Sequence, residues 1–190
     1  MSCNFKFGGM KALLMMSGVL CLLASSAGAQ TSSGQLTITM SVQSSITLVF
    51  KNNPSVGTAG FCPLTNAGTN NVGLDMGTAA FPGNFHTSAC VNYTHVTGAV
   101  YQVSSAFDVV VTKANSSSPN YRLAAEISTP PPANVSWLLN NVTLTTAGFT
   151  TLDAADNYAA PVTKTLQVQV KNTVAAQALL ETITFLATAN

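Results

Sequence analysis

Short segments in which apolar and polar residues alternate recur along most of this chain, and they constrain its fold more than any other feature. The clearest is residues 35–43. One face of this segment would carry four apolar side chains, those of Leu36, Ile38, Met40 and Val42. Successive side chains of a β-strand point to opposite faces of the sheet, so this alternation predicts a half-buried strand.

Further strands are expected wherever the period of two returns between clusters of turn-forming residues. They are residues 45–50, 72–76, 90–96, 99–104, 107–113, 121–128, 135–139, 142–146, 163–170 and 181–188. Residues 51–71, 79–88 and 148–161 are expected to be loops, and only residues 173–181 resemble a short helix. This succession predicts an all-β fold, an antiparallel β-sandwich with Greek-key connections.

The first 29 residues have the pattern of a cleavable secretory signal peptide. Lys6 and Lys11 precede an apolar run over residues 12–24, and small residues follow, ending in Ala27-Gly28-Ala29. We expect cleavage between Ala29 and Gln30, which leaves residues 30–190 as a single domain. The alternative is a membrane anchor, but the run is shorter than the roughly 20 residues that span a bilayer.

Charge is scarce in this chain. Charged residues make up 7% of it, against about a quarter in typical globular domains. The seven basic residues include Lys6 and Lys11 of the leader, so the exported part has no basic cluster for nucleic acid or an anionic membrane surface. We expect a protein of the periplasm, the cell surface or the extracellular space.

Two cysteines, Cys62 and Cys90, remain after the leader is removed. An even pair in an exported chain indicates a disulfide, and the alternative is two buried thiols. His86 and His95 flank Cys90, yet the odd separation of Cys90 and His95 places them on opposite faces of a strand. No copper site or other metal centre is therefore expected from this stretch.

Asp153, Asp156 and Asn157 form a small oxygen-rich cluster that could supply ligands to a weakly bound calcium ion. The same residue types are common in turns, so an ordinary turn is the alternative. The sequence contains neither G-x-S-x-G nor H-E-x-x-H. We expect no cofactor and no enzymatic activity.

Four aromatic residues, Phe81, Phe85, Tyr93 and Tyr101, leave two interpretations open. They are either part of the core or a platform on which a carbohydrate could stack. In the second case the protein would be a secreted binding module.

Three segments resemble secreted bacterial immunoglobulin-like surface proteins, a group that includes fimbrial subunits and spore-coat-like pilin relatives. They are residues 35–42 (QLTITMSV), 73–77 (GLDMG) and 181–188 (ETITFLAT). The resemblance implies an immunoglobulin-like sandwich with a non-catalytic structural or adhesive role. Its partners would be other surface subunits or copies of itself. Leu36, Ile38, Met40 and Val42 would then form a donor strand that adds to a neighbour's sheet, or else a strand that pairs within its own domain.

Overall fold

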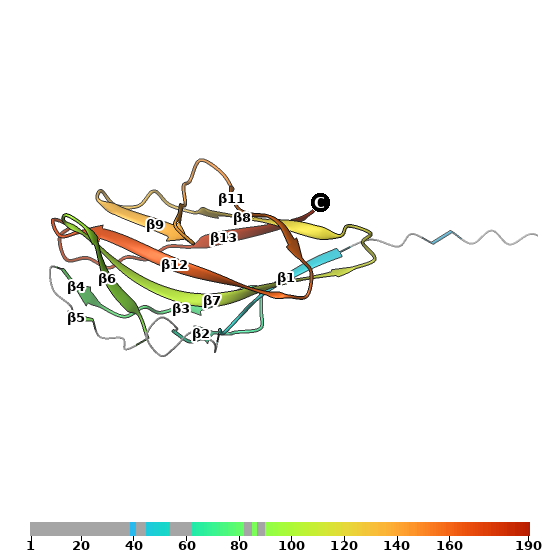
Figure 1. Cartoon of the computed structure of the whole chain (residues 1–190), viewed down its shortest axis with the longest axis horizontal. Coiled ribbons are helices and arrows are strands. Elements are labelled where there is room, and N and C mark those ends of the chain that lie inside the picture. The colour runs from blue at the N-terminus through green and yellow to red at the C-terminus, as the bar shows by residue number, and fades with distance from the viewer. Residues whose placement is uncertain (1–38, 41–44, 54–61, 82–84, 87–89) are drawn as a thin grey trace, which may run out of the picture. The chain divides into compact units, whose positions relative to one another are not determined.

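The computed structural model describes residues 39–40, 45–53, 62–81, 85–86 and 90–190. The chain divides into two compact units, Met1–Ser41 and Val42–Asn190. All strands in the described part of the chain lie in the second unit (Figure 1). In the described part of the chain there is no helix with the length and apolar character needed to cross a membrane.

The larger sheet has six strands, in the order β1-β7-β12-β9-β10, and β6 also pairs with β7. All its pairs are antiparallel. The long strand β7 is central, because β6 and β1 follow one another along one of its edges and β12 lies along the other. The strands are β1 (Ser45–Lys51), β6 (Asn92–Thr97), β7 (Val100–Ala114), β9 (Val135–Leu139), β10 (Val142–Thr143) and β12 (Pro161–Lys171).

The smaller sheet has three antiparallel strands in the order β11-β8-β13. They are β8 (Asn120–Ile127), β11 (Thr150–Asn157) and β13 (Ile183–Ala189). Two further pairs contain two residues per strand: β2 (Leu64–Thr65) with β3 (Gly73–Leu74), and β4 (Ala79–Ala80) with β5 (Phe85–His86).

One hydrophobic core unites the two main sheets. The larger sheet contributes Phe107, Val109 and Val111 of β7, and the smaller contributes Leu123 and Ile127 of β8. The expectation of an all-β antiparallel fold is confirmed, and the arrangement is consistent with a β-sandwich.

Strand β7 corrects the sequence prediction, which placed two strands at 99–104 and 107–113. The structure has one strand of 15 residues. The predicted break falls at Ser105, which is fully buried. Its hydroxyl accepts a hydrogen bond from the Cys62 backbone N–H at 2.8 Å. Because this buried hydroxyl has a hydrogen-bond partner, the strand can continue through Ser105 inside the core.

Strand β11 corrects a second prediction, because residues 148–161 were expected to be a loop. The strand contains register shifts between Thr151 and Asp153 and between Asp153 and Asp156. Each shift inserts an extra residue opposite β8, and such bulges remove the period of two from the sequence.

Residues 173–181 form no helix, contrary to the expectation of a helical turn. The carboxylate of Glu181 instead accepts hydrogen bonds from Ser128 and Thr129 at the end of β8. These long-range contacts fix the segment that leads into β13. They outweigh the weak local preference of this segment for a helix.

Candidate functional site

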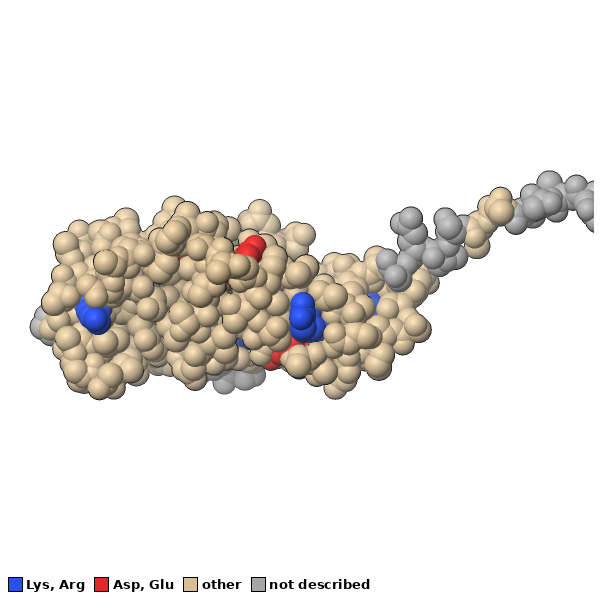
Figure 2. Space-filling model, turned by 90° about the horizontal axis from the view of Figure 1, so that it is seen from above, with Lys and Arg blue, Asp and Glu red and all other residues tan. Residues whose placement is uncertain are grey.

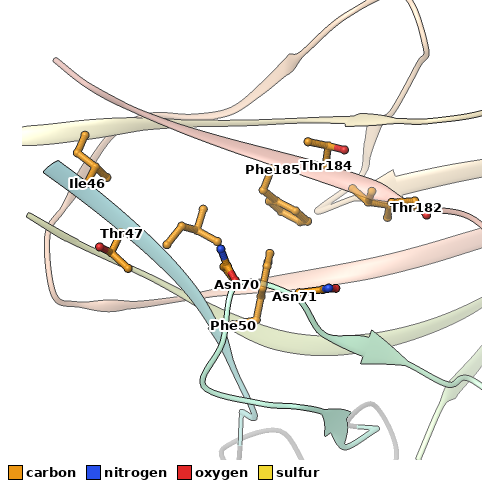
Figure 3. A pocket seen from close by; sticks show the side chains of 10 residues that line it. Ile46, Thr47, Phe50, Asn70, Asn71, Thr182, Thr184 and Phe185 are labelled. Atoms are coloured by element: carbon orange, nitrogen blue, oxygen red, sulfur yellow. The ribbon is translucent and has the colours of Figure 1, made fainter.

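A groove of about 530 Å³ lies between the edge strands β1 and β13 (Figure 3). Its residues come from β1, from the loop before β3 and from the beginning of β13. They are Ile46, Thr47, Leu48, Phe50, Asn70, Asn71, Thr182, Ile183, Thr184 and Phe185.

The groove lies where each sheet ends. In the described part of the chain, β1 has only β7 as a strand neighbour and β13 has only β8. The outer edge of β1 is covered at one end, where Phe50 N–H donates to the Thr69 carbonyl at 2.9 Å and Gly68 N–H donates to the Phe50 carbonyl at 2.6 Å. The remainder of both edges offers the row of backbone groups to which another strand can add.

Apolar rings form the floor of the groove. In Figure 3, Phe50 and Phe185 point toward each other, and their ring centroids are 5.0 Å apart in an edge-to-face arrangement. Phe107 supports Phe185 from the larger sheet at 6.1 Å. Ile46 and Ile183 also line the groove and are half-buried.

The rim of the groove is polar but uncharged. It consists of threonine and asparagine side chains, and no charged residue is among those that line it. Figure 2 shows few charged residues on the face of the protein that it presents, and one basic residue there lies beside an acidic one. The groove therefore favours an uncharged occupant with apolar side chains on one face and hydroxyls or amides on the other.

Glu181 fixes the beginning of the β13 wall. Its carboxylate accepts hydrogen bonds from Ser128, Thr129 and the backbone N–H of Thr182. Partial burial alone would raise the pKa of Glu181, but the hydrogen bonds from Thr129 and Ser128 outweigh this effect and lower the pKa.

The predicted disulfide is present, because Cys62 and Cys90 are bonded to each other. Cys62 is fully buried, and the bond ties the segment before β2 to the segment before β6. A cysteine in a disulfide has no thiolate to offer a metal.

The aromatic side chains near β6 pack on one another. Phe81 stacks on Tyr93 with centroids 5.5 Å apart and planes 19° apart, and Tyr101 lies 5.6 Å from Phe81. All three rings are half-buried, and His95 is exposed 4.9 Å from Tyr101. Phe81 and Tyr93 thus each cover one face of the other ring, which favours the interpretation that they pack on each other over that of a sugar-binding platform. The Phe85 side chain lies outside the described residues.

The three residues of the calcium hypothesis differ in their surroundings. Asp153 Oδ2 forms an ion pair with Lys164 Nζ, and Asn157 is exposed. In the described residues, no three side chains of the types His, Cys, Asp and Glu lie close enough together to hold a metal ion. Calcium binding stays a prediction, and at Asp153 a cation would compete with the lysine ammonium.

Lys164 is a buried residue that the sequence interpretation did not single out, with 1% of its surface exposed. A signal was present, because Lys164 has the same strand parity as Leu166 and Val168, whose side chains face the core. A lysine at such a position indicates a buried partner.

Several predicted positions lie outside the described residues. These are Ala27, Ala29 and Gln30 at the expected cleavage site, and Leu36, Ile38 and Val42 of the alternating segment. Met40 is described and lies in no helix or strand.

No family model, no curated protein and no solved structure matches this chain.

Proposed function

We propose that this protein is a non-catalytic, exported structural subunit of a bacterial surface that assembles with copies of itself by strand addition. Residues 36–42 of one copy would enter the groove between β1 and β13 of the next. The groove between two edge strands, each with a strand neighbour on only one side in the described part of the chain, is the observation that carries this proposal.

The strand order supports an immunoglobulin-like topology. That fold has one sheet in the order A-B-E-D and a second that contains C, F and G. The order β1-β7-β12-β9 corresponds to the first sheet, and the pair β8-β13 corresponds to C and F. In the described residues no strand occupies the position of G beside β13, which is the side on which the groove lies.

Residues 36–42 match this position in length and pattern. The segment has the same length as β1 and β13, which have 7 residues each. Leu36, Ile38, Met40 and Val42 would face the apolar floor, and the threonines and serine between them would face solvent. The added backbone would satisfy N–H and C=O groups on the open edges.

Two further observations agree with this role. The disulfide Cys62–Cys90 suits a protein that matures in an oxidising compartment. The uncharged rim of the groove suits a donor segment that itself contains no charged residue.

Single substitutions on the two faces of the donor segment test the proposal in the full-length chain. Ile38→Asp would place a carboxylate on the apolar floor, whereas Thr39→Asp puts the same charge on the opposite face. We expect Ile38→Asp to weaken self-association about 100-fold, because it replaces a buried aliphatic side chain by a charge. Thr39→Asp should assemble like the wild type.

The readouts are sedimentation velocity and electron microscopy of the purified, exported protein. Filaments or a concentration-dependent ladder of oligomers in the wild type, lost only in Ile38→Asp, support strand exchange. A wild-type protein that stays monomeric at all concentrations contradicts the proposal. In that case residues 36–42 pair within their own domain or have another role.

A further inference from the structure

A compact polar cluster lies between the two sheets, on the side of β8 away from the groove. It joins Lys164 of β12 to Asp153 of β11, with Asp156 and Tyr121 beside them. Lys164 and Tyr121 are at most 1% exposed, and Asp153 and Asp156 are partly buried. Water therefore has little access to the lysine amine.

The bulge in β11 brings the two carboxyl groups to the same side. Asp153 and Asp156 are three positions apart, so a regular strand would point them to opposite faces. The register shift pairs Asp153 with Leu123 and Asp156 with Tyr121, two positions on the same face of β8. Burial raises the pKa of the Asp156 carboxyl, and the neighbouring charge of Asp153 raises it further, while Lys164 lowers it.

Two polar atoms of the cluster are buried without a hydrogen-bond partner, the Tyr121 hydroxyl and Asp156 Oδ2. They are the two such side-chain atoms in the described part of the chain, and both lie at this one place. Buried polar atoms are nearly always satisfied, so two such atoms at one place require a structural explanation.

We propose that Lys164 and Asp153 join in an intramolecular amide bond, with Nζ of the lysine on β12 linked to Cγ of the aspartate on β11. The bond would connect the two sheets of the sandwich covalently. An amide adds one N–H and one C=O to the cluster. Asp156 Oδ2 can accept from the N–H, and the Tyr121 hydroxyl can donate to the C=O.

The reaction is a condensation and needs no oxidant, reductant or other reagent. Proton transfer within the ion pair gives a neutral amine and a neutral carboxylic acid. The Nζ lone pair then attacks Cγ of Asp153, a C–N bond forms and a C–O bond breaks. The departing oxygen takes two of the three protons of the original ammonium and leaves as water, and the third proton stays on the amide nitrogen. Asp156 relays protons between nitrogen and oxygen as a general acid and base.

Positioning accelerates this condensation, which is slow between free amine and carboxyl groups. Folding holds the amine against the carboxyl carbon, and such an intramolecular arrangement can equal effective concentrations of about 10⁵ M or more. Burial of Lys164 also limits the access of water to the amide from the lysine side.

Peptide mass spectrometry of the exported, full-length wild-type protein tests the proposal. Trypsin cleaves after an unmodified lysine, so an acylated Lys164 gives one peptide from Leu123 to Lys171 that is lighter by one water molecule. Chymotryptic cleavage after Tyr158 should leave the two fragments joined. Cleavage after Lys164 in the folded wild-type protein, with peptides of unmodified mass, overturns the proposal.

Variants identify the atoms involved. Asp153→Ala and Lys164→Arg should each abolish the loss of water, and Lys171→Arg, an exposed position on the same strand, should leave it unchanged. Asp156→Ala should reduce the linked fraction at least tenfold in freshly made protein. If Asp156→Ala is linked to the same extent as the wild type, Asp156 takes no part in the reaction. If the loss of water persists in Lys164→Arg, the bond involves other residues.

Discussion

The smaller sheet meets the larger one differently along its two edge strands. On the β11 side, Asp153 reaches across the sandwich to the buried ammonium of Lys164. On the β13 side, phenylalanine rings meet over a groove of about 530 Å³ with an uncharged rim. One side is closed by a polar contact between specific atoms. The other has apolar surface and strand edges to which no further described strand is paired.

This difference has a physical reason. A buried ion pair allows little freedom in its geometry, because a displaced partner leaves a charge without solvation. Apolar surface is non-directional and accepts any occupant of suitable shape. A subunit that must stay intact and yet receive a neighbour would separate these two tasks, with a fixed β11 side and a receptive β13 side.

Removal of one partner on the closed side should have the largest effect on stability. Asp153→Ala leaves the Lys164 ammonium buried without a paired carboxylate and also removes the acyl group of the proposed amide, and we expect a loss of about 3 kcal/mol or more in the free energy of unfolding. The double variant Lys164→Met with Asp153→Leu should lose less, because no unpaired lysine remains. Urea denaturation of the three proteins measures this, and equal stability of Asp153→Ala and wild type would show that the two sides do not differ.

Occupation of the open side should come next in size. A peptide with the sequence of residues 35–43, added to the full-length protein, should stabilise the subunit by about 2.7 kcal/mol at 100 times its Kd. It should also shorten any assemblies, because it competes for the same groove. The control is a peptide of equal composition in which the apolar and polar positions are exchanged. If both peptides act equally, the groove does not recognise the alternation.

The smallest expected effect concerns the attachment of the β13 wall. Hydrogen bonds lower the pKa of Glu181 in the folded state, so its contribution to stability is present above the unfolded pKa and is lost as the pH falls through the folded pKa. At neutral pH we expect Glu181→Gln to cost about 1 kcal/mol. Thermal unfolding at several pH values should show this difference shrink below about pH 4. A difference that is independent of pH would assign the effect to packing.

Strands with regular alternation were predictable with nearly correct bounds. Residues 135–139 form β9 as expected, and the prediction of 45–50 differs from β1 by one residue. The turn at Asn140-Asn141 was also predictable, since both residues adopt positive φ, a conformation that asparagine tolerates well. In these places local propensity and tertiary packing favour the same structure.

The predictions that were wrong concern residues whose conformation depends on distant contacts. Ser105 continues a strand because Cys62 donates to it, and residues 150–157 join a sheet through bulges that hide their period. No local pattern reveals either contact. The sequence indicated a donor segment but did not indicate the groove that would accept it. The groove lies between β1 and β13, which more than 130 residues separate in the chain.

By itself the sequence determined the all-β class, because strand periodicity is a local property. It also predicted the pairing of Cys62 with Cys90, the two cysteines outside the expected leader, and the structure contains that bond. The tertiary structure alone decided which strands stay at the edges and which side chains meet between the sheets. Hydrogen-bond register and core packing place β1 beside β13 and Lys164 beside Asp153, and both depend on how strands far apart in the chain are brought together.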